Sequence, residues 1–466
     1  MIVILGAGIA GLSVAESLRG KTSLAIKVLE RDLVPGGASR TVRFGEFRYD
    51  LGGHRFYSKK RHVQRFIERL IGPDLLVVDR VSHIAFRGKM VEYPLSAFNA
   101  LAALGPWEAC LATGDYVLSR ARQLFGKNDA RTFEEWTVGR FGTRLYRTFF
   151  KDYTEKLWGV PCERLSADFA DQRIKGLSFR EVVKDAIARR GKATTLVRRF
   201  LYPRLGFGMI PERMASGWEP PNEVLCGMPA EKVIHDGRRV LAVESRGVSF
   251  PVTHCVSSLP MDDLVRMLEP RPDRAVLEAA ERLRYRDLVI LFIALARERV
   301  SDDHWVYFPD RQCPFARFHE PKNWSPAMAP EDKTGLVVEF FCERGDVVWN
   351  ASPEKLCRWA TDYLEGLGMV RQSEVIGCDV QRVAKAYPVY ELGYRAHVET
   401  ILGYLERFEN LQSVGRNALF RYTSSDHYID MGIRAAANIL GGSYDLREVG
   451  TEPGYAEDGE FAAPTA

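Results

Sequence analysis

The first eleven residues, MIVILGAGIAG, constrain the fold more than any other part of the chain. Residues 1–5 are a continuous apolar run, which is typical of a strand buried on both faces of a parallel sheet. Gly6, Gly8 and Gly11 follow in the spacing G-x-G-x-x-G: the first permits a tight turn, the second admits a pyrophosphate, and the third lets a helix pack on the strand. The motif predicts a strand, a turn and a helix over about 9–18 whose N-terminus faces a dinucleotide.

The residues after this motif agree with dinucleotide binding. A second apolar strand, residues 25–29, ends in Glu30, 19 positions after Gly11. In such folds a carboxylate at this place accepts hydrogen bonds from the adenosine ribose. The alternative is a glycine-rich turn without a ligand, and the flanking strands and acid favour the dinucleotide.

Composition and charge exclude several classes of protein. The 466 residues carry 65 basic and 61 acidic side chains, so the net charge of +4 gives no reason to expect nucleic acid. Eight cysteines occur without a C-x-x-C pair, which predicts reduced thiols, a cytoplasmic protein, and neither a zinc site nor a disulfide framework. Because a strand begins at residue 2, we expect no signal peptide, and the short apolar runs predict no membrane insertion.

Helical and strand patterns alternate along the chain in an order that predicts three regions. Residues 61–199 are mostly helical, with a hairpin over 83–91; strands near 233–245, 253–260, 287–298, 335–342 and 410–416 follow, and 431–440 is a helix after an interruption at 422–430. We predict a discontinuous nucleotide-binding domain over 1–60, 200–265 and 405–445. The predicted insertions are a helical substrate or cap region over 61–199 and a β-rich substrate domain over 266–404, and a disordered tail is predicted over 446–466.

Further glycine clusters favour a flavin over a nicotinamide. Gly36 and Gly37 precede Arg40, a second glycine pair precedes His54, and a late turn contains Val414-Gly415-Arg416. This arrangement resembles the flavoproteins that include amine oxidases, protoporphyrinogen oxidase, phytoene desaturases and UDP-galactopyranose mutases. The resemblance implies an α/β fold with a discontinuous Rossmann-type FAD-binding domain, an inserted α+β substrate domain and a helical subdomain. It implies FAD as the cofactor, held by Gly6, Gly8, Gly11, Glu30, Gly37, Arg40, Gly53, His54, Gly415 and Arg416.

Three short blocks resemble the UDP-galactopyranose mutase branch of this group. They are residues 150–173, residues 305–317, which end in Cys-Pro-Phe-Ala-Arg, and Ala386-Tyr387-Pro388. The resemblance implies a pocket for a sugar nucleotide in which aromatic side chains and arginines meet the base and the diphosphate. The implied substrate-binding residues are Tyr153, Trp158, Arg173, Trp305, Tyr307, Arg317, Tyr387 and Tyr422.

The residue types in these blocks suit a nucleoside diphosphate. Arg173 and Arg317 offer two guanidinium forks, and such forks bind phosphate oxygens bidentately. Trp158 offers an apolar face for a base, although it fits equally a place in the core, and either arginine fits a surface ion pair. The resemblance to the mutases implies that His54 lies beside the flavin ring, with a turn cap as the alternative; His54, Arg173 and Arg317 are the candidate catalytic residues. The histidines form no ligand cluster, so no metal is predicted.

The segment after Arg416 departs from the mutase pattern. Arg421, Tyr422, Asp426 and His427 are present, but residues 423–425 are Thr-Ser-Ser where the family carries amide side chains. A hydroxyl is shorter than an amide and offers different hydrogen bonds. Asp430 adds an acid nearby. These changes leave the identity of the sugar, and the type of reaction, open.

The sequence favours an FAD-dependent mutase that interconverts pyranose and furanose forms of a nucleotide-linked sugar. By resemblance, the reduced flavin acts as the nucleophile, so NAD(P)H is an expected external reductant. The alternative is an FAD-dependent oxidase or dehydrogenase with net turnover on a sugar, an amine or another small molecule. No sequence feature sets the oligomeric state.

Overall fold

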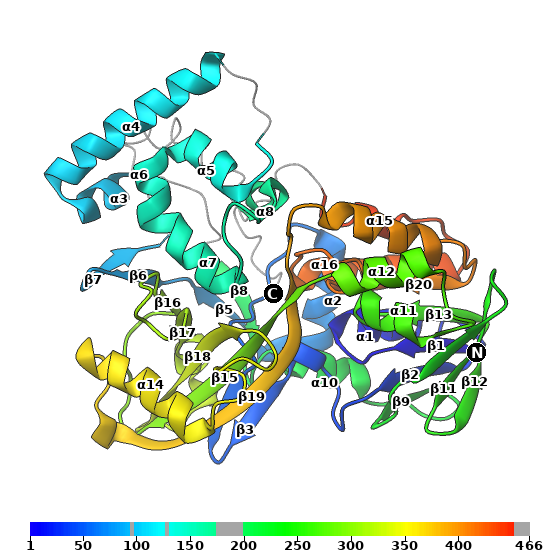
Figure 1. The fold of residues 1–466 in the computed structure, drawn as a ribbon. Helices are drawn as coiled ribbons and strands as arrows, with labels where there is room; N and C mark the ends of the chain where they lie inside the picture. Colours follow the sequence, from blue (N-terminus) through cyan, green and yellow to red (C-terminus); the bar gives the residue numbers. More distant parts are fainter. Residues whose placement is uncertain (94–96, 126–129, 174–198, 452–466) are drawn as a thin grey trace.

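The structure, a computed structural model, describes residues 1–93, 97–125, 130–173 and 199–451. It begins on a parallel sheet with the strand order β20-β13-β1-β2-β9 (Figure 1). These strands are β1 (Ile2–Leu5), β2 (Ile26–Glu30), β9 (Glu223–Cys226), β13 (His254–Ser257) and β20 (Leu411–Ser413). Every side chain of β1 is buried, because the strand lies inside the sheet and is covered on both faces. The predicted buried strand at the start of the chain is confirmed.

Helices cover the parallel sheet and bring three distant parts of the sequence together. Helix α1 (Ile9–Leu18) packs against α10 (Met209–Ala215) and α16 (Ser425–Ile439). The predicted helix over 9–18 is therefore confirmed. The interruption predicted at 422–430 is wrong in part, because α16 already begins at Ser425, where Ser424 caps it. Helices α11 (Met261–Met267), α12 (Arg274–Arg282) and α15 (Tyr394–Leu405) lie nearby (Figure 1).

A small sheet with the order β12-β11-β10-β14 lies beside the parallel sheet. Its strands are β10 (Lys232–His235), β11 (Val240–Ser245), β12 (Val248–Pro251) and β14 (Leu268–Glu269). The turn between β10 and β11 is the predicted hairpin turn. Asp236 Oδ1 accepts hydrogen bonds from the Arg238 and Arg239 amides and so stabilises the turn.

A larger mixed sheet follows the order β19-β15-β18-β17-β16-β6-β7. Its strands are β6 (Ser82–Phe86), β7 (Lys89–Glu92), β15 (Tyr285–Leu295), β16 (Trp305–Tyr307), β17 (Arg317–His319), β18 (Thr334–Cys342) and β19 (Val375–Pro388). Alternate residues of β15 enter two separate clusters: Val289 and Leu291 meet α14 (Pro353–Gly366), whereas Ile290 and Phe292 meet β4 (Phe47–Asp50). Burial on both faces explains why β15 is a continuous apolar run.

The helical region stands over one end of the larger sheet (Figure 1). Its elements are α3 (Ala97–Leu104), α4 (Pro106–Phe125), α5 (Phe133–Phe141), α6 (Thr143–Leu145), a π-helical segment (Tyr146–Lys151), α7 (Asp152–Trp158) and α8 (Ala167–Arg173). Helix α2 (Arg61–Ile71) lies apart from them and packs against α10 and α16, beside the parallel sheet. A capping box begins α5, because Thr132 Oγ1 accepts from the Glu135 amide while Glu135 Oε2 accepts from the Thr132 amide. The hairpin predicted at 83–91 is confirmed as β6 and β7, and it joins the larger sheet through β16.

Cysteine pairing differs from the sequence prediction. Cys357 on α14 and Cys378 on β19 form a disulfide, so the expectation of reduced thiols is wrong for this pair. The two residues are 21 positions apart and carry no motif. The two cysteines meet because α14 packs on the face of the sheet that carries Cys378. A rule based on cysteine spacing cannot detect such a tertiary contact.

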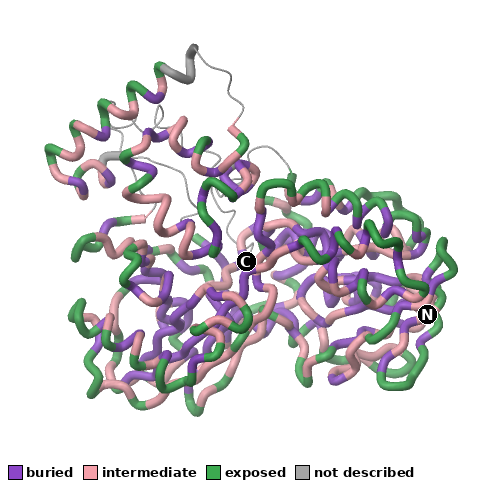
Figure 2. Tube along the Cα trace, in the orientation of Figure 1, coloured by how far each residue is buried: buried purple, intermediate pink, exposed green. Residues whose placement is uncertain are grey.

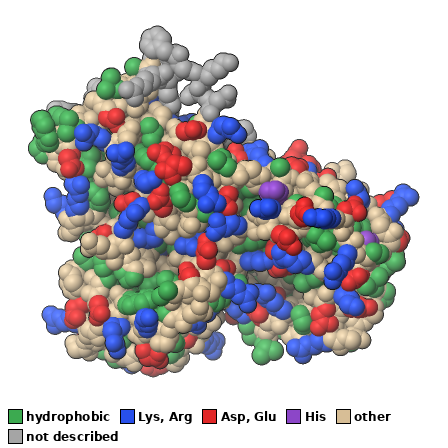
Figure 3. All heavy atoms as spheres, viewed as in Figure 1, with side chains coloured by type: hydrophobic (Ala, Val, Ile, Leu, Met, Phe, Trp, Pro, Cys, Tyr) green, Lys and Arg blue, Asp and Glu red, His purple; other side chains and the backbone are tan. Residues whose placement is uncertain are grey.

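The surface of the described residues mixes both signs of charge. Buried residues follow the strands, and exposed residues form the outer loops and outward helix faces (Figure 2). On the face shown in Figure 3, lysine and arginine side chains alternate with aspartate and glutamate. Within the described ranges, no helix is both long and apolar enough to cross a membrane. A disordered tail is predicted over 446–466, but Leu446–Glu448 form a 3₁₀ helix and Leu446 and Val449 are buried. Residues 452–466 lie outside the described residues.

Candidate functional site

The glycine motif has the geometry that a bound pyrophosphate needs. Gly6 has a φ of +94°, and a Cβ on Gly11 would lie 2.1 Å from the Gly6 carbonyl oxygen. A side chain at Gly11 would therefore force α1 away from β1. A Cβ on Gly8, in contrast, would meet nothing within 4 Å. Open space at the N-terminus of α1 is where a phosphate would approach the backbone amides.

Glu30 is held at the end of β2, next to this turn. Its Oε2 accepts a hydrogen bond of 2.8 Å from the Ala7 amide, and its Oε1 accepts one of 2.9 Å from the Asp32 amide. Two backbone donors fix the orientation of the buried carboxylate. Each oxygen keeps a second lone pair, so the carboxylate can still accept from a ribose hydroxyl, as predicted.

The second glycine cluster lies directly against the first. The Gly36 amide donates to the Ala7 carbonyl at 2.7 Å, and a Cβ on Gly37 would lie 3.7 Å from Gly8 Cα. Arg40 Nη1 donates to Asp32 Oδ2 at 3.0 Å, so part of its charge is already balanced. The predicted contact of Arg40 with the cofactor stays a prediction.

The third cluster, Gly52-Gly53-His54, follows β4 and lies against the larger sheet. A Cβ on Gly53 would lie 2.2 Å from Trp305 Nε1, so only glycine fits beside this indole. The Gly53 amide donates to Glu339 Oε1 at 3.2 Å. This loop is thus fixed from β16 and β18, and it presents His54 next to the ring of Phe207, with 5.3 Å between the ring centroids.

His54 is neutral at ordinary pH. Burial, together with the positive charges of Arg416 and Arg317, lowers the pKa of its imidazole to about 4. Its Nδ1 atom is buried and has no hydrogen-bond partner among the described residues. A buried polar atom of this kind needs a partner, and a ligand beside the glycine loop would supply one.

Arg317 is paired with a fully buried carboxylate. Arg317 on β17 and Glu339 on β18 are register partners, and Arg317 Nη2 donates to Glu339 Oε2 at 2.6 Å. Arg317 keeps some accessible surface, and its Nε atom is buried without a described partner. The predicted anion-binding arginine is therefore already ion-paired with a carboxylate, and Glu339, which sequence analysis did not single out, orients it.

Arg416 follows the Gly415 turn and is surrounded by tyrosines. Its guanidinium carbon lies 4.6 Å, 5.2 Å and 5.6 Å from the ring centroids of Tyr387, Tyr422 and Tyr428. Its two Nη atoms donate to the Ala386 and Thr423 carbonyls, each at 3.0 Å. Among the described residues no carboxylate forms an ion pair with Arg416. These contacts unite the late glycine turn with the predicted Tyr-Pro block.

Trp158 joins the same cluster from the helical region. It ends α7, is 3% exposed, and its ring centroid lies 6.0 Å from those of Tyr387 and Tyr422. Phe169 of α8 packs on its other side at 4.5 Å. The structure therefore brings Trp158, Tyr387, Tyr422 and Arg416 together from three distant parts of the chain.

A second aromatic wall contains residues that sequence analysis missed. Tyr307 lies 6.3 Å from Tyr153 and 4.9 Å from Tyr93, measured between ring centroids. Arg80 lies within 5.5 Å of the rings of Tyr93 and Trp305. Tyr93 and Arg80 belong to no motif, so only their places beside β6 and β16 reveal them. Arg173 ends α8, and its side chain lies outside what the structure describes.

The altered turn at 423–425 serves mainly to begin α16. Ser424 Oγ contacts Asp426 Oδ1 at 2.5 Å and His427 Nδ1 at 2.9 Å, so this hydroxyl is engaged in the cap. Thr423 is buried, and its Oγ1 has no hydrogen-bond partner among the described residues. Three hydroxyls stand where the mutase pattern has amides. Only the Thr423 hydroxyl is buried without a hydrogen-bond partner among the described residues, so it is the one available to a ligand.

Asp430 does not join the cluster around Arg416. Its carboxylate is fully buried and contacts Lys60 Nζ at 2.7 Å, His62 Nε2 at 2.8 Å and Arg434 Nε at 3.3 Å. Burial opposes the charge, but the bonds from Lys60 and His62 outweigh it and lower the pKa of Asp430. This acid therefore ties α16 to the start of α2.

Replacing Asp430 with Asn should lower the free energy of unfolding by about 3 kcal/mol, because it removes the buried negative charge that pairs with the largely buried Lys60 ammonium. Urea denaturation followed by circular dichroism measures the change. Asp79→Asn, which breaks an exposed pair with Arg199, is the matched control and should cost less than about 1 kcal/mol. Equal losses in the two variants would contradict a buried structural role for Asp430.

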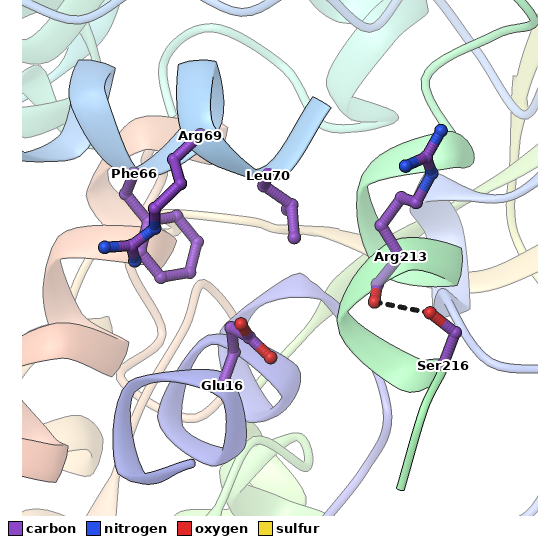
Figure 4. A pocket seen from close by; sticks show the side chains of 6 residues that line it. All are labelled: Glu16, Phe66, Arg69, Leu70, Arg213 and Ser216. Atoms are coloured by element: carbon purple, nitrogen blue, oxygen red, sulfur yellow. Dashed lines mark hydrogen bonds between the residues drawn. The ribbon is translucent and has the colours of Figure 1, made fainter. Parts of the chain in front are cut away.

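A cavity of about 390 Å³ lies elsewhere, between α1, α2 and α10 (Figure 4). It is lined by Glu16, Phe66, Arg69, Leu70, Arg213 and Ser216. No predicted site residue lines it. Among the described residues, no group of His, Cys, Asp or Glu side chains could hold a metal ion.

The described residues fit a flavin dinucleotide. The open space at Gly8, the oriented Glu30 carboxylate and the close second glycine loop suit an adenosine diphosphate. The third glycine loop carries the His54 Nδ1 atom, which is buried without a hydrogen-bond partner among the described residues. A flavin ring bound beside this loop could provide that partner. Fold and site together define a flavoprotein.

Comparison with known proteins agrees with this class. The family described as flavin-containing amine oxidoreductase matches residues 9–440, and the chain belongs to that family. Two curated relatives match shorter segments. The dTDP-fucopyranose mutase of Escherichia coli is 25% identical over 173 residues, and the protein of Klebsiella pneumoniae named "Probable UDP-galactopyranose mutase" is 26% identical over 175 residues. Each match covers 36% of this chain and less than half of the relative, 44% and 43% respectively.

Solved structures show the same fold over nearly the whole chain. The crystal structure of reduced UDP-galactopyranose mutase superposes with a TM-score of 0.85 at 22% identity and covers 98% of both chains. Wild-type putrescine oxidase bound to putrescine gives a TM-score of 0.66 at 16% identity, covering 95% of this chain and 99% of the oxidase. At these identities the likeness establishes the fold, and the predicted α/β fold with insertions is confirmed.

Proposed function

We propose that the protein is an FAD-dependent mutase that interconverts the pyranose and furanose forms of a nucleotide-diphosphate sugar while its flavin is reduced. The observation that carries the proposal is Arg416, which the resemblance assigned to the flavin and which we now assign to the substrate diphosphate. This guanidinium has a buried Nε and, among the described residues, tyrosine rings and carbonyls but no carboxylate around it. A cation in such surroundings needs an anion, and a diphosphate is one.

The named relatives support the same substrate class. Both curated relatives are sugar mutases by name, and the structure with a TM-score of 0.85 is a mutase in its reduced form. An amine or an apolar substrate would gain nothing from a buried arginine such as Arg416, which has no carboxylate partner among the described residues. We therefore favour the mutase over the oxidase or dehydrogenase.

The chain's own residues divide the work in this proposal. Arg416 and Arg317 hold the diphosphate before and after it leaves the sugar, and Tyr387 adds a hydroxyl without adding charge. Trp158, at 3% exposure, packs against Tyr387 and Tyr422 as a core residue and supports their rings, in place of the base-stacking role predicted for it. Arg173 contributes charge from the end of α8. When bound, the reduced flavin supplies a nucleophile for the anomeric carbon.

His54 adds no charge beside the ring, because its pKa is about 4. It therefore acts there as a neutral hydrogen-bonding group.

The cofactor and its surroundings complete the proposal. FAD, with an adenosine half, suits Glu30 and the first glycine turn, and Gly415 brings backbone close to α1, since its Cβ would lie 3.0 Å from Ala10 Cβ. We further propose NAD(P)H as the external reductant and the cytoplasm as the location, because reduced nicotinamide is plentiful there.

Anaerobic reduction separates the proposed mutase from an oxidoreductase. The purified protein is reduced with dithionite and given UDP-, GDP- and dTDP-sugars, and the products are separated by chromatography. We expect a ring-isomerised sugar nucleotide with no net change in flavin oxidation state. The oxidised protein is the control and should be inactive. Turnover by the oxidised protein alone, with peroxide formed or an acceptor reduced, would establish the oxidoreductase instead.

The neutrality of His54 predicts a pH effect on stability. The unfolded imidazole binds a proton below pH 6.5, whereas the folded one does so only near pH 4. The unfolded state therefore holds more protons between pH 6.5 and 4, and stability falls as the pH falls through that window. Between pH 7 and pH 4, the free energy of unfolding of His54→Gln should fall by about 2 kcal/mol less than that of wild type. This value is smaller than the whole pKa shift would give, because the ring is partly exposed to solvent. Parallel denaturation curves at each pH measure it, and identical pH profiles would contradict it.

A further inference from the structure

Lys385 has a backbone conformation that is unusual for its position. Four described non-glycine residues have positive φ: Arg87, Arg246, Lys385 and Phe420. Arg87 and Arg246 precede glycines in the turns of hairpins, where positive φ is ordinary. Lys385, with φ of +52°, lies inside β19. A side chain held in this region of backbone space persists only where its surroundings fix it.

The conformation forms a bulge immediately before Tyr387. Val383 pairs with Leu288 and Tyr387 pairs with Arg286, so three residues of β19 face one residue of β15. Two extra residues keep Tyr387 on the same face of the sheet as Val383, but they shift it along β15 so that it lies opposite Arg286. The bulge therefore decides how far along the sheet the Tyr387 side chain lies.

Several independent contacts hold the bulge. The Lys385 amide donates to Asp287 Oδ1 at 2.6 Å, and its carbonyl accepts from Asn417 Nδ2 at 2.6 Å. Its ammonium contacts Asp262 Oδ2 at 2.6 Å and Asp263 Oδ1 at 2.7 Å. The Asp262 side chain is only 4% exposed, so this ion pair is poorly screened by water.

Most of these contacts come from the nucleotide-binding side of the molecule. Asp262 and Asp263 begin α11 just after β13, and Asn417 follows β20; both strands belong to the parallel sheet. Arg416 adds a hydrogen bond of 3.0 Å to the Ala386 carbonyl, the residue between the bulge and Tyr387. Segments that follow two strands of the parallel sheet thus hold a strand of the larger sheet at the point where it enters the candidate site.

We propose that Lys385 is a positioning residue: its ion pair with the start of α11 locks the bulge in β19 and thereby places the Tyr387 ring over Arg416, where the substrate diphosphate binds. The ligand in this statement rests on the proposed function. The placement of Tyr387 rests on the contacts alone, so the two parts are tested separately.

Substitutions at Lys385 separate the backbone conformation from the charge. Lys385→Val removes the ammonium and places a β-branched residue where φ is positive, whereas Lys385→Gly removes the ammonium but accepts that φ freely. We expect Lys385→Val to weaken UDP binding to the flavin-loaded protein at least tenfold, and Lys385→Gly to weaken it less. Titration of the flavin absorbance with UDP measures the dissociation constant, and the melting temperature is recorded for each variant.

Arg246→Val is the matched control, because it places valine at a φ of +47° in the β11–β12 turn. It should lower the melting temperature without changing UDP affinity. UDP affinity within twofold of wild type in Lys385→Val, or an equal loss in Arg246→Val, would overturn the proposal. A wild type that binds GDP or dTDP in place of UDP is titrated with that nucleotide instead. Should wild type bind none of the three, the proposed function fails, and crystal structures decide the placement: a Tyr387 ring displaced from Arg416 in Lys385→Val supports it, and an unmoved ring overturns it.

Discussion

Replacing Arg317 with Met should lower the free energy of unfolding by about 3–5 kcal/mol, because it leaves Glu339 buried without its counter-ion. The Glu339 side chain is completely buried, and the hydrogen bond from the Gly53 amide at 3.2 Å is then its main remaining support. Urea denaturation of the flavin-loaded protein measures the loss. Under the proposed function, affinity for a nucleotide-diphosphate sugar falls at least tenfold as well, since a charged hydrogen bond is worth about 1.5–3 kcal/mol.

A double variant separates these two effects of Arg317. Arg317→Met combined with Glu339→Gln removes both charges, so most of the lost stability should return while substrate affinity stays low. Recovery of substrate affinity in the double variant would contradict a direct role for Arg317 in holding the diphosphate. Failure to recover any stability would contradict the interpretation of the pair as a buried ion pair.

Gly11→Ala should lower stability, whereas Gly8→Ala should lower flavin affinity. At Gly11 the new methyl group would lie 2.1 Å from the Gly6 carbonyl oxygen, so α1 must shift and stability should fall by about 3 kcal/mol. At Gly8 the methyl group meets no protein atom, so the protein should fold normally. It would, however, occupy the place of the pyrophosphate and lower flavin affinity on the order of a hundredfold, the cost of about two charged hydrogen bonds.

Flavin content after purification and the unfolding curve of the flavin-free protein test this contrast. Gly403→Ala in α15 is the control: a Cβ there meets nothing within 4 Å, so both measurements should match wild type or show a slightly more stable helix. A Gly8→Ala protein that is unstable without flavin, or that retains flavin fully, would contradict the assignment of this turn to the pyrophosphate.

Elements defined by local patterns were predictable from sequence. The apolar run of β1, the glycine turn and α1 form one continuous signal, and the hairpin β10–β11 is marked by Asp236 and Gly237. Each depends on neighbours within a few residues, where sequence spacing and spatial distance agree. The early start of α16 was missed because the Ser424 cap resembles a loop until its hydrogen bonds to Asp426 and His427 are seen.

The candidate site was predictable only where a motif marked it. Trp158, Tyr387, Tyr422 and Arg416 were found through the family resemblance, and the structure brings them together. Glu339, Arg80 and Tyr93 belong to no motif. They meet the site through strand register and ring contact across long sequence separations, which no local pattern encodes. The roles assigned to all these residues, and the three predicted domains, stay proposals.

The sequence by itself determined that this chain begins on a dinucleotide-binding turn, because glycine spacing, a buried strand and a terminal acid are all local features. Only the tertiary structure decided how charge is distributed in the site. Arg317 forms an ion pair with Glu339, and Asp430 forms one with Lys60 at the start of α2. Arg416 is surrounded by tyrosine rings. The physical reason is that the energy of a charge depends on what lies within a few ångströms of it in space, and sequence distance does not report that.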